Sequence, residues 1–100
     1  MIVAAMVTGI EPERKISIRK DDGSLVEKRV VQVWVKSADE ASQGAWVTIV
    51  KLWDNQIDDA SEMGLAINSM VSVDIKPAYH KNYKTGACMP SLTTKITAIL

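Results

Sequence analysis

Residues 25–36 read LVEKRVVQVWVK, and the alternation in the second half of this stretch decides the fold class. Val31, Val33 and Val35 fall on one side of an extended chain, whereas Trp34 falls on the other side among polar and basic neighbours. Side chains alternate between the two faces of a β-strand, so this pattern predicts a long strand with one buried face. It also predicts that Trp34 looks away from the core.

The rest of the chain predicts further strands around this one and a single helix. The expected strands are Ile2–Gly9, which bends near Pro12 and continues through Arg14–Lys20, then Leu25–Lys36, Ala45–Trp53, Met70–Lys76 and Ser91–Leu100. Between them we expect a turn at Asp21–Ser24, a polar loop at Ser37–Gly44, a helix at Asp54–Ile67 capped by Asp54 or Asn55, and a long loop at Pro77–Pro90.

Three strands, a helix and two strands form the element order of the five-stranded Greek-key barrel known as the OB-fold. A β-sandwich would need about seven short strands and no lone helix between the third and the fourth. We therefore predict an all-β, single-domain OB-fold barrel spanning residues 1–100, with one α-helix between strands 3 and 4.

Composition narrows the class of protein. The chain has 100 residues, of which 47% are hydrophobic, and its 12 basic and 12 acidic residues cancel. The single cysteine, Cys88, excludes an internal disulfide and indicates a reducing compartment. No apolar run reaches the roughly 18 residues that a membrane span needs. We expect a cytoplasmic protein with no membrane partner.

The distribution of charge is more informative than its sum. Most basic residues lie in the first half of the chain, and the expected helix carries four acids and no base. A neutral total is therefore compatible with one basic and one acidic face, or with evenly interspersed surface charge.

Catalytic patterns are missing from the sequence. The adjacent acids Asp21-Asp22 and Asp58-Asp59 suit a turn and a helix N-terminus better than a pair of catalytic carboxylates. His80 is the only histidine, and no cysteine or carboxylate with ligand spacing surrounds it. We expect no enzyme activity, no metal and no cofactor.

Several short motifs, taken in order, carry a family resemblance. An apolar first strand is followed by Gly9 and a Pro12-Glu13-Arg14 element, and the third strand begins with Trp46. Residues 65–73, LAINSMVSV, place a leucine before a turn and a Val-x-Val strand, with Asn68 at a position that favours a left-handed backbone. A long final hairpin contains aromatics, lysines and a glycine.

With these motifs the chain resembles the bacterial and phage single-stranded DNA-binding proteins, and more loosely the primosomal replication protein. The resemblance implies an OB-fold that binds single-stranded DNA in replication and recombination and forms a homodimer or tetramer. Cellular members end in a flexible linker and an acidic tail, whereas this sequence stops at Leu100. A phage, plasmid or primosomal type fits better, and a phage protein would act in the host cytoplasm.

The candidate binding residues are aromatic or basic. Trp34 and Trp46 are expected to stack on bases, Tyr79 and Tyr83 to close over the strand, and Lys15, Lys28, Lys36, Lys81 and Lys84 to neutralise phosphates. Trp53 has the opposite parity to Trp46, and we expect it to seal the core under the helix.

Alternatives stay open for each of these assignments. Trp34 could instead pack in an oligomer interface, or the register of its strand could be reversed so that Trp34 faces the core, and the Tyr79–Gly86 hairpin could be an ordinary solvated loop. For the whole chain the alternative is an OB-fold protein-interaction or RNA-binding module. The apolar stretch Ile2–Val7 predicts a long edge strand, through which copies of the chain would associate.

Overall fold

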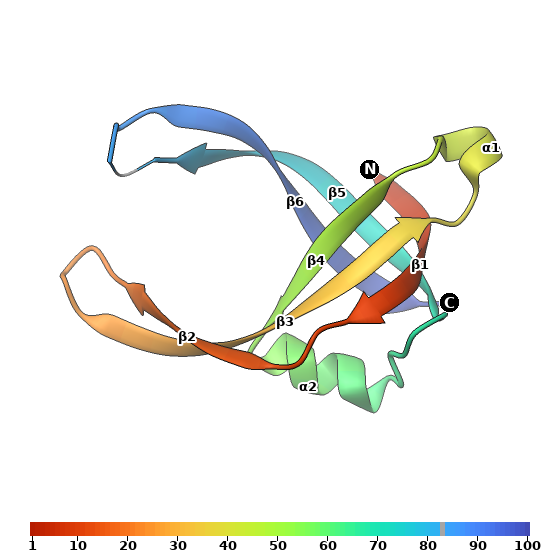
Figure 1. The fold of residues 1–100 in the computed structure, drawn as a ribbon, viewed down its shortest axis with the longest axis horizontal. Coiled ribbons are helices and arrows are strands. Elements are labelled where there is room, and N and C mark those ends of the chain that lie inside the picture. The colour runs from red at the N-terminus through yellow and green to blue at the C-terminus, as the bar shows by residue number, and fades with distance from the viewer. Residues whose placement is uncertain (83) are drawn as a thin grey trace.

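An antiparallel six-stranded sheet with two short helices makes up the computed structural model, which describes residues 1–82 and 84–100 (Figure 1). The elements are β1 (Ile2–Ile10), β2 (Arg14–Arg19), β3 (Leu25–Ser37), α1 (Glu40–Gln43), β4 (Val47–Trp53), α2 (Asn55–Glu62), β5 (Met70–Lys81) and β6 (Cys88–Ile99). Among the described residues, no helix has the length and apolar character to cross a membrane.

The strands follow the order β2-β3-β1-β5-β6, and β4 pairs with β3 beside this path. β1 pairs with β3 on one side and with β5 on the other, so the expectation that Ile2–Val7 forms a free edge is wrong. The segment is apolar because β1 lies between two other strands and contributes side chains to the core. The strands with one unpaired side are β2, β4 and β6.

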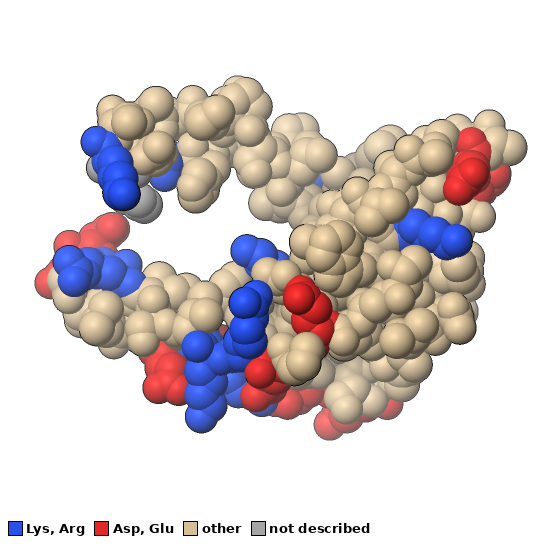
Figure 2. All heavy atoms as spheres, in the orientation of Figure 1, with Lys and Arg blue, Asp and Glu red and all other residues tan. Residues whose placement is uncertain are grey.

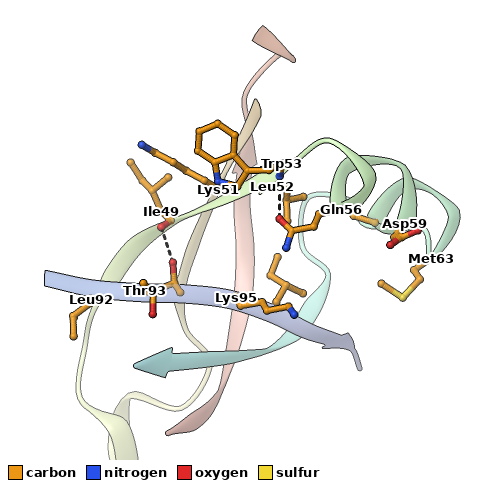
Figure 3. Close-up of a pocket in the computed structure, with 13 residues that line it drawn as sticks. Ile49, Lys51, Leu52, Trp53, Gln56, Asp59, Met63, Leu92, Thr93 and Lys95 are labelled. Carbon is orange, nitrogen blue, oxygen red and sulfur yellow. Dashed lines mark hydrogen bonds between the residues drawn. The ribbon is translucent and has the colours of Figure 1, made fainter. Parts of the chain in front are cut away.

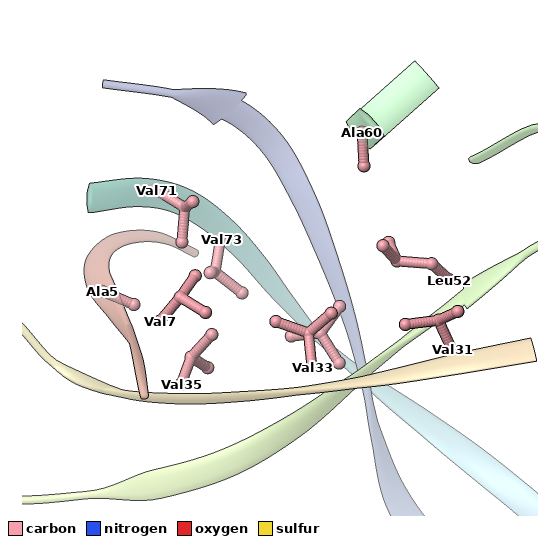
Figure 4. Packing of buried hydrophobic residues seen from close by; sticks show 10 residues of the cluster. Ala5, Val7, Val31, Val33, Val35, Leu52, Ala60, Val71 and Val73 are labelled. Carbon is pink, nitrogen blue, oxygen red and sulfur yellow. The ribbon is translucent and has the colours of Figure 1, made fainter. Parts of the chain in front are cut away.

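The core is built from small β-branched side chains. Val7, Val33, Val35, Val50, Val71 and Val73 are the largest fully buried side chains (Figure 4). They come from β1, β3, β4 and β5, and each strand contributes alternate residues. This confirms the predicted buried face of β3. Ala60 of α2 packs with Leu52 at one end of the core.

β4 and β6 approach each other without forming a backbone ladder in the described part of the chain, so the sheet does not close on itself. The Thr94 hydroxyl donates to the Ile49 carbonyl at 3.1 Å, and the Gln56 side-chain oxygen accepts from the Trp53 N–H at 3.0 Å. These side chains therefore form hydrogen bonds with backbone groups of β4 that a pairing of β4 with β6 would use.

Two hairpins extend beyond the core as two-stranded arms. The β2–β3 arm turns at Asp21–Ser24 as expected, with Gly23 at φ 85°. The β5–β6 arm corrects the expectation of a long loop over Pro77–Pro90, because strand pairing continues to Lys81 and Cys88. Proline is tolerated there because within the arm β5 and β6 pair only with each other, so a missing N–H on the outer side costs no ladder bond. Both arms project in the same direction (Figure 1).

The helices differ from expectation at their ends. Within the expected polar loop, the Asp39 carboxylate accepts from the N–H groups of Ala41 and Ser42 and caps the short helix α1. α2 ends at Glu62 and not at Ile67, because the chain turns at Gly64 with φ 80°. Asn68 adopts the predicted left-handed conformation, with φ 73°.

Candidate nucleic-acid interface

Trp34 lies on the solvent-facing side of β3, as the alternation predicts. Its side chain is 40% exposed, whereas Val33 and Val35 on either side are fully buried. Trp34 is aligned with Gly9 of β1, where a Cβ would lie 3.7 Å from the indole Cδ1. The absent side chain of Gly9 thus gives the indole a flat backbone surface on which to rest.

The same face continues onto β4. The register aligns Trp34 with Ile49, Gln32 with Lys51, and Val30 with Trp53. Aligned residues of antiparallel strands point to the same side, so Trp53 shares the face of Trp34. Trp53 lies four residues beyond Ile49, which places the two tryptophans about 13 Å apart along the strand direction.

The structure reverses the expected positions of Trp46, which the resemblance placed on the binding face, and of Trp53, which we expected in the core. Trp46 is half-buried and packs against the core, so the expectation that it faces a bound strand is corrected. Trp53 is half-buried and is not among the hydrophobic residues that pack against the core cluster. The physical reason is parity, because Trp46 is in phase with buried Val50 and Leu52, and Trp53 is in phase with exposed Lys51.

A strained corner fixes the direction of Trp53. Asp54 follows it with φ 45° and ψ −113°, a backbone conformation that non-glycine residues rarely adopt. Its carboxylate, expected to cap α2, instead accepts from the Arg29 N–H at 3.1 Å, and its own N–H donates to the Arg29 carbonyl at 3.2 Å. With the Gln56 bond to the Trp53 N–H, these contacts hold the end of β4 in place.

Three lysines lie on the side of β3 and β4 that carries Trp34 and Trp53, which we call the tryptophan face. Lys36 aligns with Val47, Lys51 lies between Ile49 and Trp53, and Lys28 is in phase with Trp34 further along β3. In the described part of the chain none of these three forms an ion pair with a carboxylate. Their positive charge is therefore available to a ligand on this face.

Lys15 does not belong to this group. It aligns with Arg29 on the opposite side of the β2–β3 arm, and its Nζ lies 3.7 Å from the Glu27 carboxylate. Arg29 donates to Asp58 at 2.9 Å and to Glu13 at 3.3 Å, and its hydrogen bond to the Asp58 carboxylate raises the Arg29 pKa. Basic and acidic residues accordingly mix where α2 meets the arm (Figure 2), and Arg29 ties the base of the arm to α2.

The β5–β6 arm carries the remaining predicted residues. Tyr79 is 80% exposed and aligns with Pro90, and Lys81 and Lys84 lie near the tip. Tyr83 lies outside the described residues. Figure 2 shows a hollow between this arm and the β2–β3 arm, with basic residues at the end of each and acidic residues as well at the end of the β2–β3 arm. Tyr79 thus lies on an arm that borders this hollow and not on the tryptophan face.

An open groove adjoins the tryptophan face between β4, α2 and β6. Its volume is about 630 Å³, and Lys51 and Trp53 line one wall, Met63 the α2 end and Lys95 the opposite wall (Figure 3). Lys51 and Lys95 are not among the binding residues predicted from the sequence. The signal for Lys51 was present, because it is the only charged residue in the alternating stretch 47–53.

Among the described residues, no group of three or more His, Cys, Asp or Glu side chains could hold a metal ion. A comparison of the chain with family models, with curated proteins and with solved structures finds no match.

Proposed function

We propose that the chain is an OB-fold module that binds single-stranded DNA without sequence preference. β1 and β2 then correspond to one strand that bends at Glu11–Glu13, and the Glu11 N–H keeps the bend on β3 by donating to the Gln32 carbonyl at 2.9 Å. With that equivalence, the pairing order matches a five-stranded Greek-key barrel. The incomplete contact of β4 with β6 is compatible with it, because OB-fold barrels are often partly open.

The observation that carries the proposal is that Trp34 and Trp53 lie on the same side of the neighbouring strands β3 and β4, with Trp34 40% exposed and Trp53 half-buried. In OB-folds, oligonucleotides bind on the face of the second and third strands, between the hairpins after the first and the fourth. Those strands correspond here to β3 and β4, and those hairpins to the β2–β3 and β5–β6 arms.

The proposed mechanism combines stacking with charge. Bases stack on Trp34 and Trp53, while Lys28, Lys36 and Lys51 neutralise the phosphates that run between them. Stacking accepts any base, because every base has a π face, so the module tolerates any sequence. The β5–β6 arm, with Tyr79, Lys81 and Lys84, flanks the bound strand. No step of this mechanism makes or breaks a covalent bond.

Self-association is part of the proposal, as a homodimer or tetramer. β1 is paired on both sides and offers no edge, so the copies would meet through another surface.

The test is fluorescence anisotropy of a labelled oligothymidine strand titrated with the protein at low salt. We expect saturable binding, and much weaker binding when the same strand is annealed to its complement, because a duplex hides its base faces. Labelled oligouridine distinguishes DNA from RNA as the preferred ligand. Equal affinity for single strand and duplex would contradict stacking, and an absence of binding to any of them would favour the protein-interaction alternative.

A further inference from the structure

On the edge of β4 that does not pair with β3, backbone groups of two residues are hydrogen-bonded to side chains, and Lys51 lies between these two residues. The Ile49 carbonyl accepts from Thr94, and the Trp53 N–H donates to Gln56, so the backbone groups of both residues point away from β3. Trp46 and Asp54 have even numbers, whereas Ile49 and Trp53 have odd numbers. The Trp46 carbonyl and the Asp54 N–H both form hydrogen bonds to β3. In an antiparallel strand these directions alternate with period two. The N–H and C=O of Lys51 therefore also point away from β3.

Those two groups of Lys51 face the groove between β4 and β6, and in the described part of the chain no ladder pairs β4 with β6. A donor and an acceptor on one residue of an edge strand form the template to which an antiparallel strand adds. Thr94 and Gln56 restrict that addition to the segment around Lys51.

The side chains that line the groove alternate in the same way. Leu52 and Ile96 lie toward the core, together with Ala60 of α2, whereas Lys51 and Lys95 point to the outer side and form no carboxylate ion pair among the described residues. Asp59 of α2 also lines the groove, at its α2 end (Figure 3). A strand laid along β4 would meet apolar side chains on one face and ammonium groups on the other.

We propose that this groove binds a short extended peptide, in which apolar and acidic side chains alternate, by adding it as a strand to β4 at Lys51. The peptide exchanges a pair of backbone hydrogen bonds with Lys51, its apolar side chains lie on Leu52 and Ile96, and its carboxylates lie beside Lys51 and Lys95. This partner is a second ligand, distinct from the single-stranded DNA of the proposed function.

The test uses a labelled octapeptide of alternating valine and glutamate, and two variants of one residue. Lys51→Ala removes the ammonium group and keeps the backbone N–H, whereas Lys51→Pro removes both and loses no bond to β3. We expect Lys51→Ala to weaken peptide binding a few fold and Lys51→Pro to weaken it at least tenfold more. Lys51 also contributes charge to the nucleic-acid face, so both variants should lose the same small amount of affinity for oligothymidine, and only the additional loss of peptide affinity in Lys51→Pro reports on the backbone site.

A second measurement keeps the proposal testable if Lys51→Pro does not fold. A peptide methylated on the alternate backbone nitrogens that would face β4 should lose its affinity for the wild-type protein, and the unmethylated peptide should slow hydrogen exchange of the Lys51 amide. Equal affinity of the two peptides, unchanged exchange at Lys51, or an absence of binding by the alternating peptide would each overturn the proposal.

Discussion

Replacing Trp34 by alanine separates a binding residue from a structural one. The indole is 40% exposed and rests on the backbone of Gly9, outside the buried valine cluster. Stacking of one base on an aromatic ring contributes about 1–3 kcal/mol, so Trp34→Ala should weaken oligothymidine binding by about 5- to 150-fold. Its effect on the free energy of unfolding should stay well below the about 3–5 kcal/mol of a core tryptophan.

Trp53→Ala and Trp46→Ala complete the experiment. Trp53→Ala should lose affinity like Trp34→Ala, because both indoles share one face. Trp46→Ala should destabilise the fold by about 2–3 kcal/mol, since the half-buried ring packs on the core, and should leave the affinity of the folded protein unchanged. Anisotropy titrations and urea unfolding measure the two effects. The assignment of faces would be refuted if Trp34→Ala unfolded the protein, or if Trp46→Ala alone abolished binding.

The other predictions concern charge, packing and assembly. Affinity for oligothymidine should fall as salt rises, with a logarithmic slope of about 0.7 per phosphate contacted, and titrations of Lys36→Ala and Lys51→Ala should show a shallower slope; an unchanged slope would remove those lysines from the site. Val33→Ala should cost about 2–3 kcal/mol of unfolding free energy in urea, because two methyl groups leave the centre of the core, and a loss below about 0.5 kcal/mol would contradict that packing. The Ser42 hydroxyl and the amides of Ser42 and Ala41 lower the Asp39 pKa, so the carboxylate stabilises the fold above its ordinary pKa of about 4, and stabilises it less as the pH falls through the lowered value. In urea unfolding, Asp39→Ala should therefore destabilise the protein at neutral pH. A difference between wild type and variant that widened toward acid pH would contradict this. Light scattering at micromolar concentration should report a mass above the 11.0 kDa of one chain, and a monomer would end the homo-oligomer proposal.

Strong alternation made β3 predictable from the sequence. Val33 and Val35 flank Trp34, and a strand with such a pattern has one register that buries its apolar face, so the exposure of Trp34 followed directly. The left-handed backbone of Asn68 followed from its position after a helix and before a strand. These predictions rest on local geometry, which one stretch of sequence determines.

The errors arise where local patterns compete with tertiary contacts. The assignment of Trp46 to the binding face rests on the family resemblance. The charge of Lys51, which identifies the outer side of β4, predicts instead that Trp46 faces the core. Pro77 and Pro90 suggested a loop, because the sequence does not show that the arm strands have an unpaired side. The pairing of β1 on both sides, and the open groove beside β4, depend on contacts between distant segments.

Tryptophan fluorescence of the unlabelled protein, titrated with oligothymidine at low salt, is the most direct test for a single-strand interface on the outer face of β3 and β4. We predict saturable quenching that high salt reverses, that persists in Trp46→Ala, and that shrinks in Trp34→Ala and again in Trp53→Ala. Fluorescence that does not change at any oligothymidine concentration, or quenching carried by Trp46 alone, would contradict a single-strand interface on the outer face of β3 and β4.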